Sequence, residues 1–215
     1  MKKIWEPNIT VQDGVFWPSH GAQIILECIA ANPEILKDKS VLDIGCGSGI
    51  LWVFSWEFWA KRICASDIDE RAVENTKINA KNNWIEIDVK RGHYGEPFWR
   101  EKFDVVFANL PQEKFTWFVN MRGNESILAF LPQAEKYMNP NGTLILAING
   151  CTPYKETIQE IQRNWKIKKA KWSWVKIKWW VQENIHLFLD KKEATLRERK
   201  WDHETPIFYL ILEKN

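Results

Sequence analysis

Short apolar runs recur along the chain at intervals that suit an alternation of strands and helices. Each run is five or six residues long and is bounded by polar or glycine-containing segments, as expected of strands buried in a sheet. Helices are predicted at 23–31 and 154–164, and strands that alternate with helices indicate a mainly parallel sheet. The first five strands are predicted at 40–44, 62–66, 85–90, 104–108 and 143–148.

The C-terminal part of the chain has a different pattern. Strands are predicted at 167–178 and 207–212, and a helical insertion is predicted at 183–200 between them. The pair Asn141-Gly142 is typical of a turn, and we expect that turn directly before the fifth strand.

The segment 41–50, VLDIGCGSGI, joins a predicted strand to a glycine-rich turn. Gly45, Gly47 and Gly49 permit a tight turn into a helix and leave room for a ligand that side chains would block. A dinucleotide fingerprint needs a further glycine at position 50, which is Ile50, and a Walker phosphate loop needs a lysine that the segment lacks. The turn is therefore predicted to admit a ligand without a phosphate chain.

Two carboxylates accompany this turn. Asp43 precedes it, and Asp67 ends the next apolar run within the segment ASDID. In open α/β sheets an acid at that place lies beside the ligand ribose, where it can accept hydrogen bonds from both hydroxyls. Ile68 offers an apolar face to a purine ring. The two segments together predict a nucleoside-binding crevice.

Four motifs in this order resemble those of class I S-adenosylmethionine (SAM)-dependent methyltransferases. They are the lead-in GVFWPSHGAQIILE, the turn VLDIGCGSGI with ASDID, the helix ERAVENTKINAKNN, and KFDVVFANLPQ, within a resemblance that spans residues 14–149. The lead-in is similar to that of the small-domain members, which include the release-factor glutamine methyltransferases. The resemblance implies an α/β, doubly wound, Rossmann-like fold, with a seven-stranded, mostly parallel sheet and an antiparallel C-terminal edge.

The resemblance also implies the cofactor, SAM, and its contacts. The family usually places an acid near position 93 that accepts a bond from the adenine amino group. His93 stands there instead, and a neutral imidazole nitrogen can still accept that bond. The expected cofactor-binding residues are Asp43, Gly45, Cys46, Gly47, Gly49, Asp67, Ile68, His93 and Asn109.

Asn109, Leu110, Pro111 and Gln112 stand where amino-methylating members carry an Asn-Pro-Pro-Tyr loop, and the first three are the expected catalytic residues. The resemblance implies that the Asn109 side-chain oxygen and the Leu110 carbonyl accept the two N–H bonds of an amide or amino nitrogen. Holding that nitrogen in line with the methyl donor can supply much of the rate, and no residue need act as a nucleophile.

Gln112 departs from the family pattern, because an aromatic ring in its place would stack on a planar substrate. We expect Gln112 and the lead-in rings of Phe16 and Trp17 to line the substrate site. Phe115 and Trp117 are further candidates for the missing ring, and the sequence leaves the choice open.

The methyl acceptor is expected to be a macromolecule, with a glutamine-type amide of a protein first and an RNA base second. The lead-in and the Asn109 loop favour protein. About forty residues precede the turn, so the long helical domain that recognises release factors is not expected. A SAM-binding or RNA-binding module without catalysis is the alternative from a different class.

The segment 163–178 bears on this choice, because it contains seven basic residues, three tryptophans and no acid. Positive charge beside aromatic rings suits single-stranded nucleic acid. The other interpretation is a peripheral strand whose lysines deter edge-to-edge pairing.

Composition fits one compact enzyme domain of 215 residues with a net charge of +2. We expect a lead-in at 1–38, a cofactor-binding core at 39–150, and C-terminal strands with the insertion at 151–215. The absence of a long apolar run and of a signal peptide predicts a soluble, cytoplasmic protein without a membrane partner. The four cysteines form no C-x-x-C pair and are expected to be reduced, and the histidines lack metal-ligand spacing.

Tryptophan is unusually abundant, with fourteen residues against ten glycines. Glycine ordinarily makes up about 7% of residues, which would be about fifteen in this chain. Trp52, Trp59 and Trp84 fall where similar methyltransferases usually have a small residue, often glycine. Two interpretations stay open: an aromatic-rich surface, or a gene in which the opal codon means glycine and was translated as tryptophan.

Overall fold

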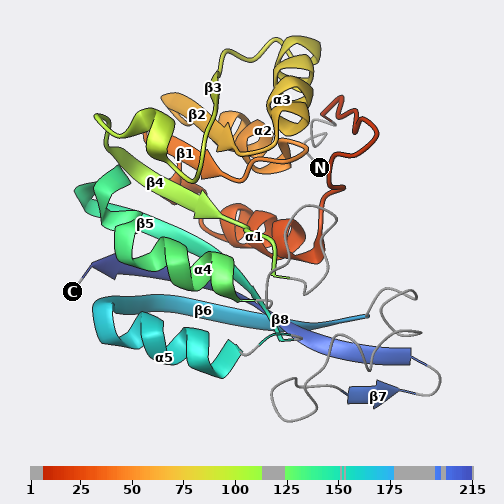
Figure 1. Ribbon diagram of the computed structural model, residues 1–215, viewed down its shortest axis with the longest axis vertical. Coiled ribbons are helices and arrows are strands. Elements are labelled where there is room, and N and C mark those ends of the chain that lie inside the picture. The colour runs from red at the N-terminus through yellow and green to blue at the C-terminus, as the bar shows by residue number, and fades with distance from the viewer. Residues whose placement is uncertain are drawn as a thin grey trace.

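The computed structural model describes residues 7–112, 124–150, 152, 154–176, 197–199 and 202–214. Its strands form one sheet in the order β3-β2-β1-β4-β5-β8-β6, and the short strand β7 pairs with β8 (Figure 1). The strands are β1 (Ser40–Ile44), β2 (Arg62–Asp67), β3 (Asp88–Arg91), β4 (Phe103–Ala108), β5 (Met138–Asn149), β6 (Trp165–Lys176), β7 (Arg197–Arg199) and β8 (Asp202–Lys214).

The first five strands are parallel, and β8 runs antiparallel between β5 and β6. This is the predicted fold class: a doubly wound, Rossmann-like sheet with an antiparallel C-terminal edge. Helices between the parallel strands make the crossovers that such pairing requires. The α-helices are α1 (His20–Ala31), α2 (Ile50–Glu57), α3 (Glu70–Asn82), α4 (Glu125–Phe130) and α5 (Tyr154–Asn164), and the 3₁₀ segments are η1 (Pro33–Ile35), η2 (Glu96–Phe98) and η3 (Leu131–Tyr137).

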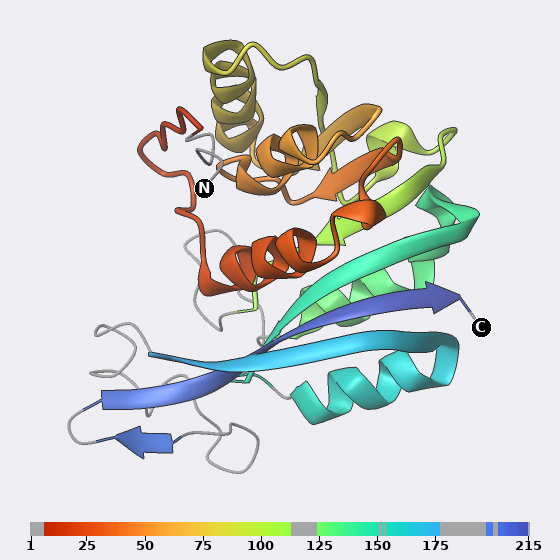
Figure 2. The same ribbon diagram turned by 180° about the vertical axis from the view of Figure 1, so that it is seen from behind.

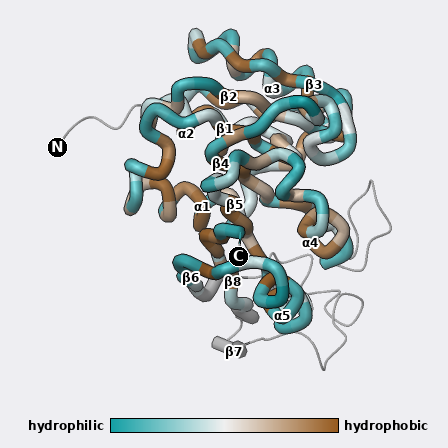
Figure 3. The backbone as a smooth tube through the Cα atoms, turned by 90° about the vertical axis from the view of Figure 1, so that its left-hand side faces the viewer, coloured by the Kyte–Doolittle hydropathy of each residue, from teal (hydrophilic) through white to brown (hydrophobic). Residues whose placement is uncertain are grey.

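Helices cover both faces of the sheet (Figures 1 and 2). On one face, α1 packs on the central strands, with Ile25 and Ile29 among the buried residues, while α2 and α3 cover β2. On the other face lie α4, η3 and α5. Both colours of the hydropathy scale appear on the turns of α3, α4 and α5, as expected of helices with one buried side (Figure 3).

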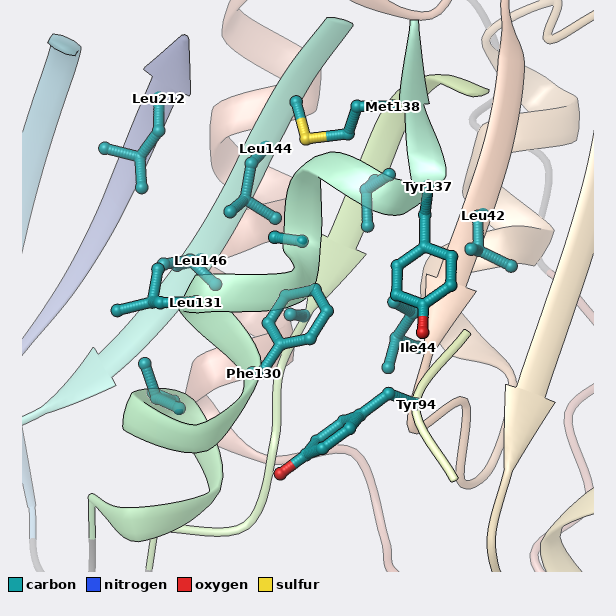
Figure 4. Packing of buried hydrophobic residues seen from close by; sticks show 14 of the residues in the cluster. Leu42, Ile44, Tyr94, Phe130, Leu131, Tyr137, Met138, Leu144, Leu146 and Leu212 are labelled. Atoms are coloured by element: carbon teal, nitrogen blue, oxygen red, sulfur yellow. The ribbon is translucent and has the colours of Figure 1, made fainter. Parts of the chain in front are cut away.

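The second face holds the largest single cluster of buried apolar residues. Figure 4 shows Phe130 and Tyr137, from α4 and η3, lying over strand residues such as Leu42 and Leu146. Burying each side chain of this size stabilises the fold by about 1.5–3 kcal/mol. This packing fixes the strands whose ends carry the candidate site.

Two predicted boundaries on the parallel strands are wrong. Asn141 and Gly142 lie inside β5, because the β4–β5 ladder continues from the Phe103–Met138 pair to the Val105–Thr143 pair across a register shift. The irregularity absorbs the turn residues without ending the strand. The third strand covers 88–91 and not 85–90, although Ile85 is buried against α2 and α3.

The predicted helical insertion at 183–200 is contradicted where it can be compared. Residues 197–199 form β7, whose backbone pairs with 202–204 of β8, and this pairing replaces the helical bonds. Residues 183–196 and 200 lie outside the described residues. Residues 165–176 of the basic segment form β6 at the end of the strand order, as the interpretation of a peripheral strand requires.

Candidate cofactor and acceptor site

The candidate site lies where two neighbouring parallel strands end. β1 and β4 pair in register up to Ile44 and Ala108, so the loops that follow them leave the same edge of the sheet side by side. Gly45 begins the first loop, and a Cβ on it would lie 3.2 Å from Cδ2 of Leu110 in the second. The predicted cofactor turn and the predicted catalytic loop are therefore in contact.

The cofactor turn depends on backbone conformations that favour glycine. Gly45, Gly47 and Gly49 have φ angles of 73°, 51° and 87°. The amides of Gly45 and Cys46 donate to the Ser66 carbonyl of β2, at 2.8 and 3.1 Å, which ties the turn to the neighbouring strand. A Cβ on Gly47 would meet no atom within 4 Å, so the turn borders open space there.

Asp67 lies at the end of β2 with its carboxylate facing the turn. One oxygen accepts from the Gly47 amide at 3.0 Å, and the other accepts from the Asp69 amide at 3.0 Å. Burial raises the pKa of Asp67, while these amides act in the opposite direction. The next residue, Ile68, is 58% exposed, so an apolar side chain stands beside the acid. Contact with a ribose and a purine stays a prediction for both residues.

Asp43 is the least satisfied polar group of the site. It is buried, and neither carboxylate oxygen has a hydrogen-bond partner among the described residues. Burial, followed by the charge of Asp67, raises its pKa to about 7. An unpaired buried carboxylate is costly, and a cationic ligand at the turn would offset that cost. SAM carries a sulfonium and an ammonium group, so this acid and the open space at Gly47 fit it.

A row of asparagines on α3, which the sequence analysis missed, holds the lead-in in place. The backbone amides of Asn8, Thr10 and Gln12 donate to the side-chain oxygens of Asn83, Asn79 and Asn75, respectively, at 2.8–2.9 Å. Four residues of helix rise about 6.0 Å and two residues of extended chain about 6.6 Å, so the two spacings match. Asparagine has a low helix propensity, so its recurrence every four residues on a predicted helix is the sequence signal that could have revealed the row.

The same helix holds the cofactor turn. Asn79 donates to both the Thr10 carbonyl, at 2.9 Å, and the Ser48 carbonyl, at 2.8 Å. Thr76 lies within 3.4 Å of the Gly47 carbonyl and of the Cys46 sulfur. Burial raises the pKa of the Cys46 thiol, which favours a neutral thiol there. Asn79 thus joins the lead-in to the turn through one side chain.

Asn109 lies just after β4 and contacts the start of α1. Its side-chain nitrogen donates to the Ser19 hydroxyl at 3.2 Å, and Ser19 is the N-cap of α1. A Cβ on Gly21 would lie 2.3 Å from the Asn109 side-chain oxygen, so glycine permits this approach. The predicted catalytic residue is thus positioned by the lead-in.

Gln112 is buried and fastens the catalytic loop to β5. Its side-chain nitrogen donates to the Ala147 carbonyl at 2.7 Å, and its oxygen accepts from the Asn149 amide at 2.8 Å. These bonds give Gln112 a structural task, and contact with substrate stays a prediction. Phe16 and Trp17 are exposed on the lead-in, whereas Phe115 and Trp117 lie outside the described residues.

The remaining predicted residues are near the turn but differ in setting. His93 is exposed, and its ring lies edge-on to Tyr94 with centroids 4.0 Å apart. The amide of its neighbour Gly92 donates to the Asp67 carbonyl at 2.9 Å, which keeps this loop beside the cofactor acid. Pro111 is exposed at the catalytic loop.

The described part of the chain lacks two further features. No group of three or more histidine, cysteine, aspartate or glutamate residues there has the arrangement of a metal site. Among the same residues, no helix combines the length and apolar character needed to span a membrane.

Comparisons with known proteins show the family of the chain. The family described as "Methyltransferase small domain" matches residues 8–175. The ribosomal protein L11 methyltransferase of Caldicellulosiruptor bescii is 44% identical over 84 residues, which are 39% of this chain and 27% of that protein. That of Aquifex aeolicus is 36% identical over 107 residues, 49% of this chain and 43% of that protein. The matched region is thus less than half the length of these relatives.

Solved structures show the same fold. A ribosomal protein L11 methylase from Lactobacillus delbrueckii subsp. bulgaricus superimposes with a TM-score of 0.65 at 19% identity, covering 99% of this chain and 91% of that one. A precorrin 8W decarboxylase from Methanobacterium thermoautotrophicum superimposes with a TM-score of 0.64 at 14% identity, covering 98% of this chain and 100% of that one. Since these proteins carry names of different chemistry, the likeness shows the fold alone.

The family match and the fold place the chain among the class I SAM-dependent methyltransferases. Within that class, the chain belongs to the methyltransferase small domain family.

Proposed function

We propose that this enzyme methylates an amino or amide nitrogen of a protein. The observation that carries the proposal is the contact between Leu110 and Gly45, because it sets the Asn109 loop directly beside the cofactor turn. The names of the ribosomal protein L11 methyltransferases support a protein acceptor. These names belong to another group than the release-factor glutamine methyltransferases, so we do not restrict the acceptor to a glutamine amide.

The chain contributes binding and orientation on the cofactor side. When bound, SAM supplies an electrophilic methyl group on a sulfonium. Asp67 accepts from the ribose hydroxyls while it also holds the Gly47 amide. The buried carboxylate of Asp43 faces the cationic part of the ligand across the turn. The lead-in is held beside the cofactor turn by Asn79, which bonds both Thr10 and Ser48.

On the acceptor side, Asn109 and Leu110 hold the substrate nitrogen. The Asn109 side-chain oxygen and the Leu110 carbonyl accept its N–H bonds, so the nitrogen lone pair points toward the methyl group. The contact of the Leu110 carbonyl with Gln112 is long, at 3.5 Å, and leaves that carbonyl able to accept a stronger bond. Ser19 fixes the Asn109 amide, and such orientation is the main source of rate in this proposal.

RNA ranks second as acceptor because three lysines of β6 already have protein partners. Lys168 pairs with Glu213 of β8, Lys169 donates to Asn32 at 2.6 Å, and the Lys171 ammonium lies 3.8 Å from the Glu27 carboxylate. These contacts support the role of a protected sheet edge.

We further propose that residues 1–215 act as one methyltransferase domain.

The test combines cofactor binding with methyl transfer. Calorimetric titration with SAM is followed by labelled methyl transfer into protein and RNA fractions, for the wild type and for Asn109→Ala. We expect label in a protein fraction from the wild type only, with similar SAM binding by both proteins. Label confined to RNA would replace the acceptor, and SAM binding without transfer to either fraction would favour the non-catalytic module.

A further inference from the structure

Three tryptophans stand at positions where the backbone or the packing calls for glycine. They are Trp52, Trp59 and Trp84, on or directly after the helices that surround the cofactor turn. We infer that the native polypeptide carries glycine at these three positions, because its gene reads the opal codon as glycine.

Trp59 follows the C-cap of α2 and has a φ of 65°. A residue in the left-handed conformation directly after a helix cap is most often glycine, because a Cβ there meets the neighbouring backbone. The Trp59 amide donates to the Trp56 carbonyl at 3.0 Å, and its own carbonyl accepts from Asp38 at 2.9 Å, so the backbone is held in this conformation. The Trp59 side chain is 75% exposed, and burial therefore offsets little of the strain.

Trp84 repeats this arrangement at the end of α3. It follows the C-cap Asn83, has a φ of 57°, and donates its amide to the Lys81 carbonyl at 3.2 Å. Its side chain is 93% exposed. Two of the described helices thus end in a left-handed residue, and in both the residue is an exposed tryptophan.

The other non-glycine residues with a left-handed backbone conformation each have a local explanation. Asp38 is of a type that tolerates this conformation through its short polar side chain. Tyr94 is buried, and its hydroxyl donates to the Ser126 carbonyl at 3.0 Å, so packing and a hydrogen bond hold it. Trp59 and Trp84 have neither a tolerant side chain nor extensive burial.

Trp52 has a different conflict, within the first turn of α2. Its side chain is buried, and the indole N–H has no hydrogen-bond partner among the described residues. A buried tryptophan usually finds such a partner. A Cβ on Gly49, the last residue of the cofactor turn, would lie 2.3 Å from the indole nitrogen. The ring therefore lies against the turn, and glycine at 52 would free that side of it.

The inference does not extend to every tryptophan. Trp165 begins β6, is buried in the main core and pairs with Lys214. A large aromatic side chain suits a buried strand position, where glycine would be destabilising. Trp165 therefore serves as the matched control, for which we expect the ordinary tryptophan codon.

The decisive measurement is mass spectrometry of the protein purified from its own cells, together with the codons of its gene. We expect glycine in the peptides that cover positions 52, 59 and 84, encoded by the opal codon, and tryptophan at position 165. Tryptophan in the native peptides at the three positions, or the ordinary tryptophan codon there, would overturn the inference.

Recombinant variants test the physical reason. Trp59→Gly and Trp84→Gly should each raise the thermal unfolding midpoint by roughly 2–4 °C, whereas Trp165→Gly should lower it. A fall in the midpoint for both Trp59→Gly and Trp84→Gly would remove the structural argument.

Trp52→Gly tests the consequence for the cofactor turn and rests on the proposed SAM site. We expect it to tighten SAM binding by about tenfold. Native glycine without SAM binding by the native protein would leave the inference intact and refute the proposed function. Native tryptophan with SAM binding would do the reverse.

Discussion

The two loops of the site are built in different ways. The cofactor turn is a local structure: Gly45, Gly47 and Gly49 adopt left-handed conformations within five residues, and Asp67 is the last residue of the next strand. The acceptor loop is held by distant segments, with Asn109 bonded to Ser19 across 90 residues. A short motif can therefore define the first loop, whereas the second depends on the whole fold.

Asp67→Ala is the largest expected break on the cofactor side. Losing two hydrogen bonds that the carboxylate accepts from the ribose hydroxyls should weaken SAM binding by about 100-fold or more. Calorimetric titration measures the affinity. Glu70→Ala is the control, because Glu70 is exposed and pairs with Arg91 on the surface. A folded Asp67→Ala protein that binds SAM as the wild type does would contradict the assignment.

Asn109→Ala should impair the acceptor loop and spare cofactor binding by the turn. Removing the side chain that orients the acceptor should lower the transfer rate by about 10²–10³-fold, because preorganised contacts of this kind carry such factors. SAM affinity should stay within about threefold of the wild type. Single-turnover transfer at saturating SAM makes the comparison. Transfer at the original rate would remove Asn109 from its role.

Ser19→Ala sharpens this result as a positioning variant. It takes away the hydroxyl that accepts from Asn109 but leaves the Asn109 side chain in place. We expect a smaller loss of rate than for Asn109→Ala, with unchanged SAM affinity. Equal losses in the two variants would mean that orientation by Ser19 accounts for the whole effect of Asn109.

The difference between the loops explains what the sequence could predict. Spacing and residue type were enough to place Gly45, Asp67 and the strand that precedes Asn109. They were not enough for Gln112, whose partners Ala147 and Asn149 lie on another strand. The sequence pattern placed Gln112 in the substrate site, while the structure shows its side-chain amide bonded to β5. Long-range hydrogen bonds of this kind leave no periodic pattern in the sequence.

The row of asparagines on α3 lies between these cases. Asn75, Asn79 and Asn83 recur at a helical interval, so their shared face was predictable. Their partners were not, because the lead-in is an irregular segment whose path depends on the fold. The positive φ angles of Trp59 and Trp84 agree with the expectation of a small residue at these positions, but they do not show which residue the native protein carries.

Asp43 predicts a pH dependence of stability. Burial raises its folded pKa to about 7 from an ordinary value of 3.8, so the folded state binds the extra proton between these values. The stability that this extra proton contributes is fully present below the ordinary pKa of 3.8 and is lost as the pH rises through the folded pKa of about 7. Asp43→Asn should therefore flatten the curve of unfolding free energy against pH, by at most about 1.4 kcal/mol per pH unit.

Urea unfolding at a series of pH values between these limits tests this prediction. The quantity to compare is the slope and not the absolute stability, since the substitution also changes packing. SAM, as a cation, should reduce the slope of the wild type and leave that of Asp43→Asn unchanged. Parallel curves for the two proteins without ligand would show that Asp43 does not titrate in this range.

Asn79→Ala should break the connection between the lead-in and the turn. The substitution removes the partner of the Thr10 amide and carbonyl and leaves the Ser48 carbonyl only a long contact with Asn75, at a cost of about 1–3 kcal/mol in unfolding free energy. SAM affinity should fall several-fold because the turn is less well held. Asn82→Ala, an exposed position on the same helix, should change stability by less than about 0.5 kcal/mol. Equal effects of the two variants would contradict the proposed connection.

The smallest expected effect belongs to the sheet edge, where the choice between protein and RNA can be sharpened. Lys168 and Lys171 pair with Glu213 and Glu27, and these pairs are partly exposed. Replacing both lysines with alanine should cost less than about 1 kcal/mol for each pair, because solvent screens such charges. Transfer to protein should not change, as it should not for the exposed Lys155→Ala on α5. A loss of transfer in the variant without Lys168 and Lys171, but not in Lys155→Ala, would assign this edge to substrate binding. If the lost label were in RNA, RNA would become the first choice of acceptor and protein the second.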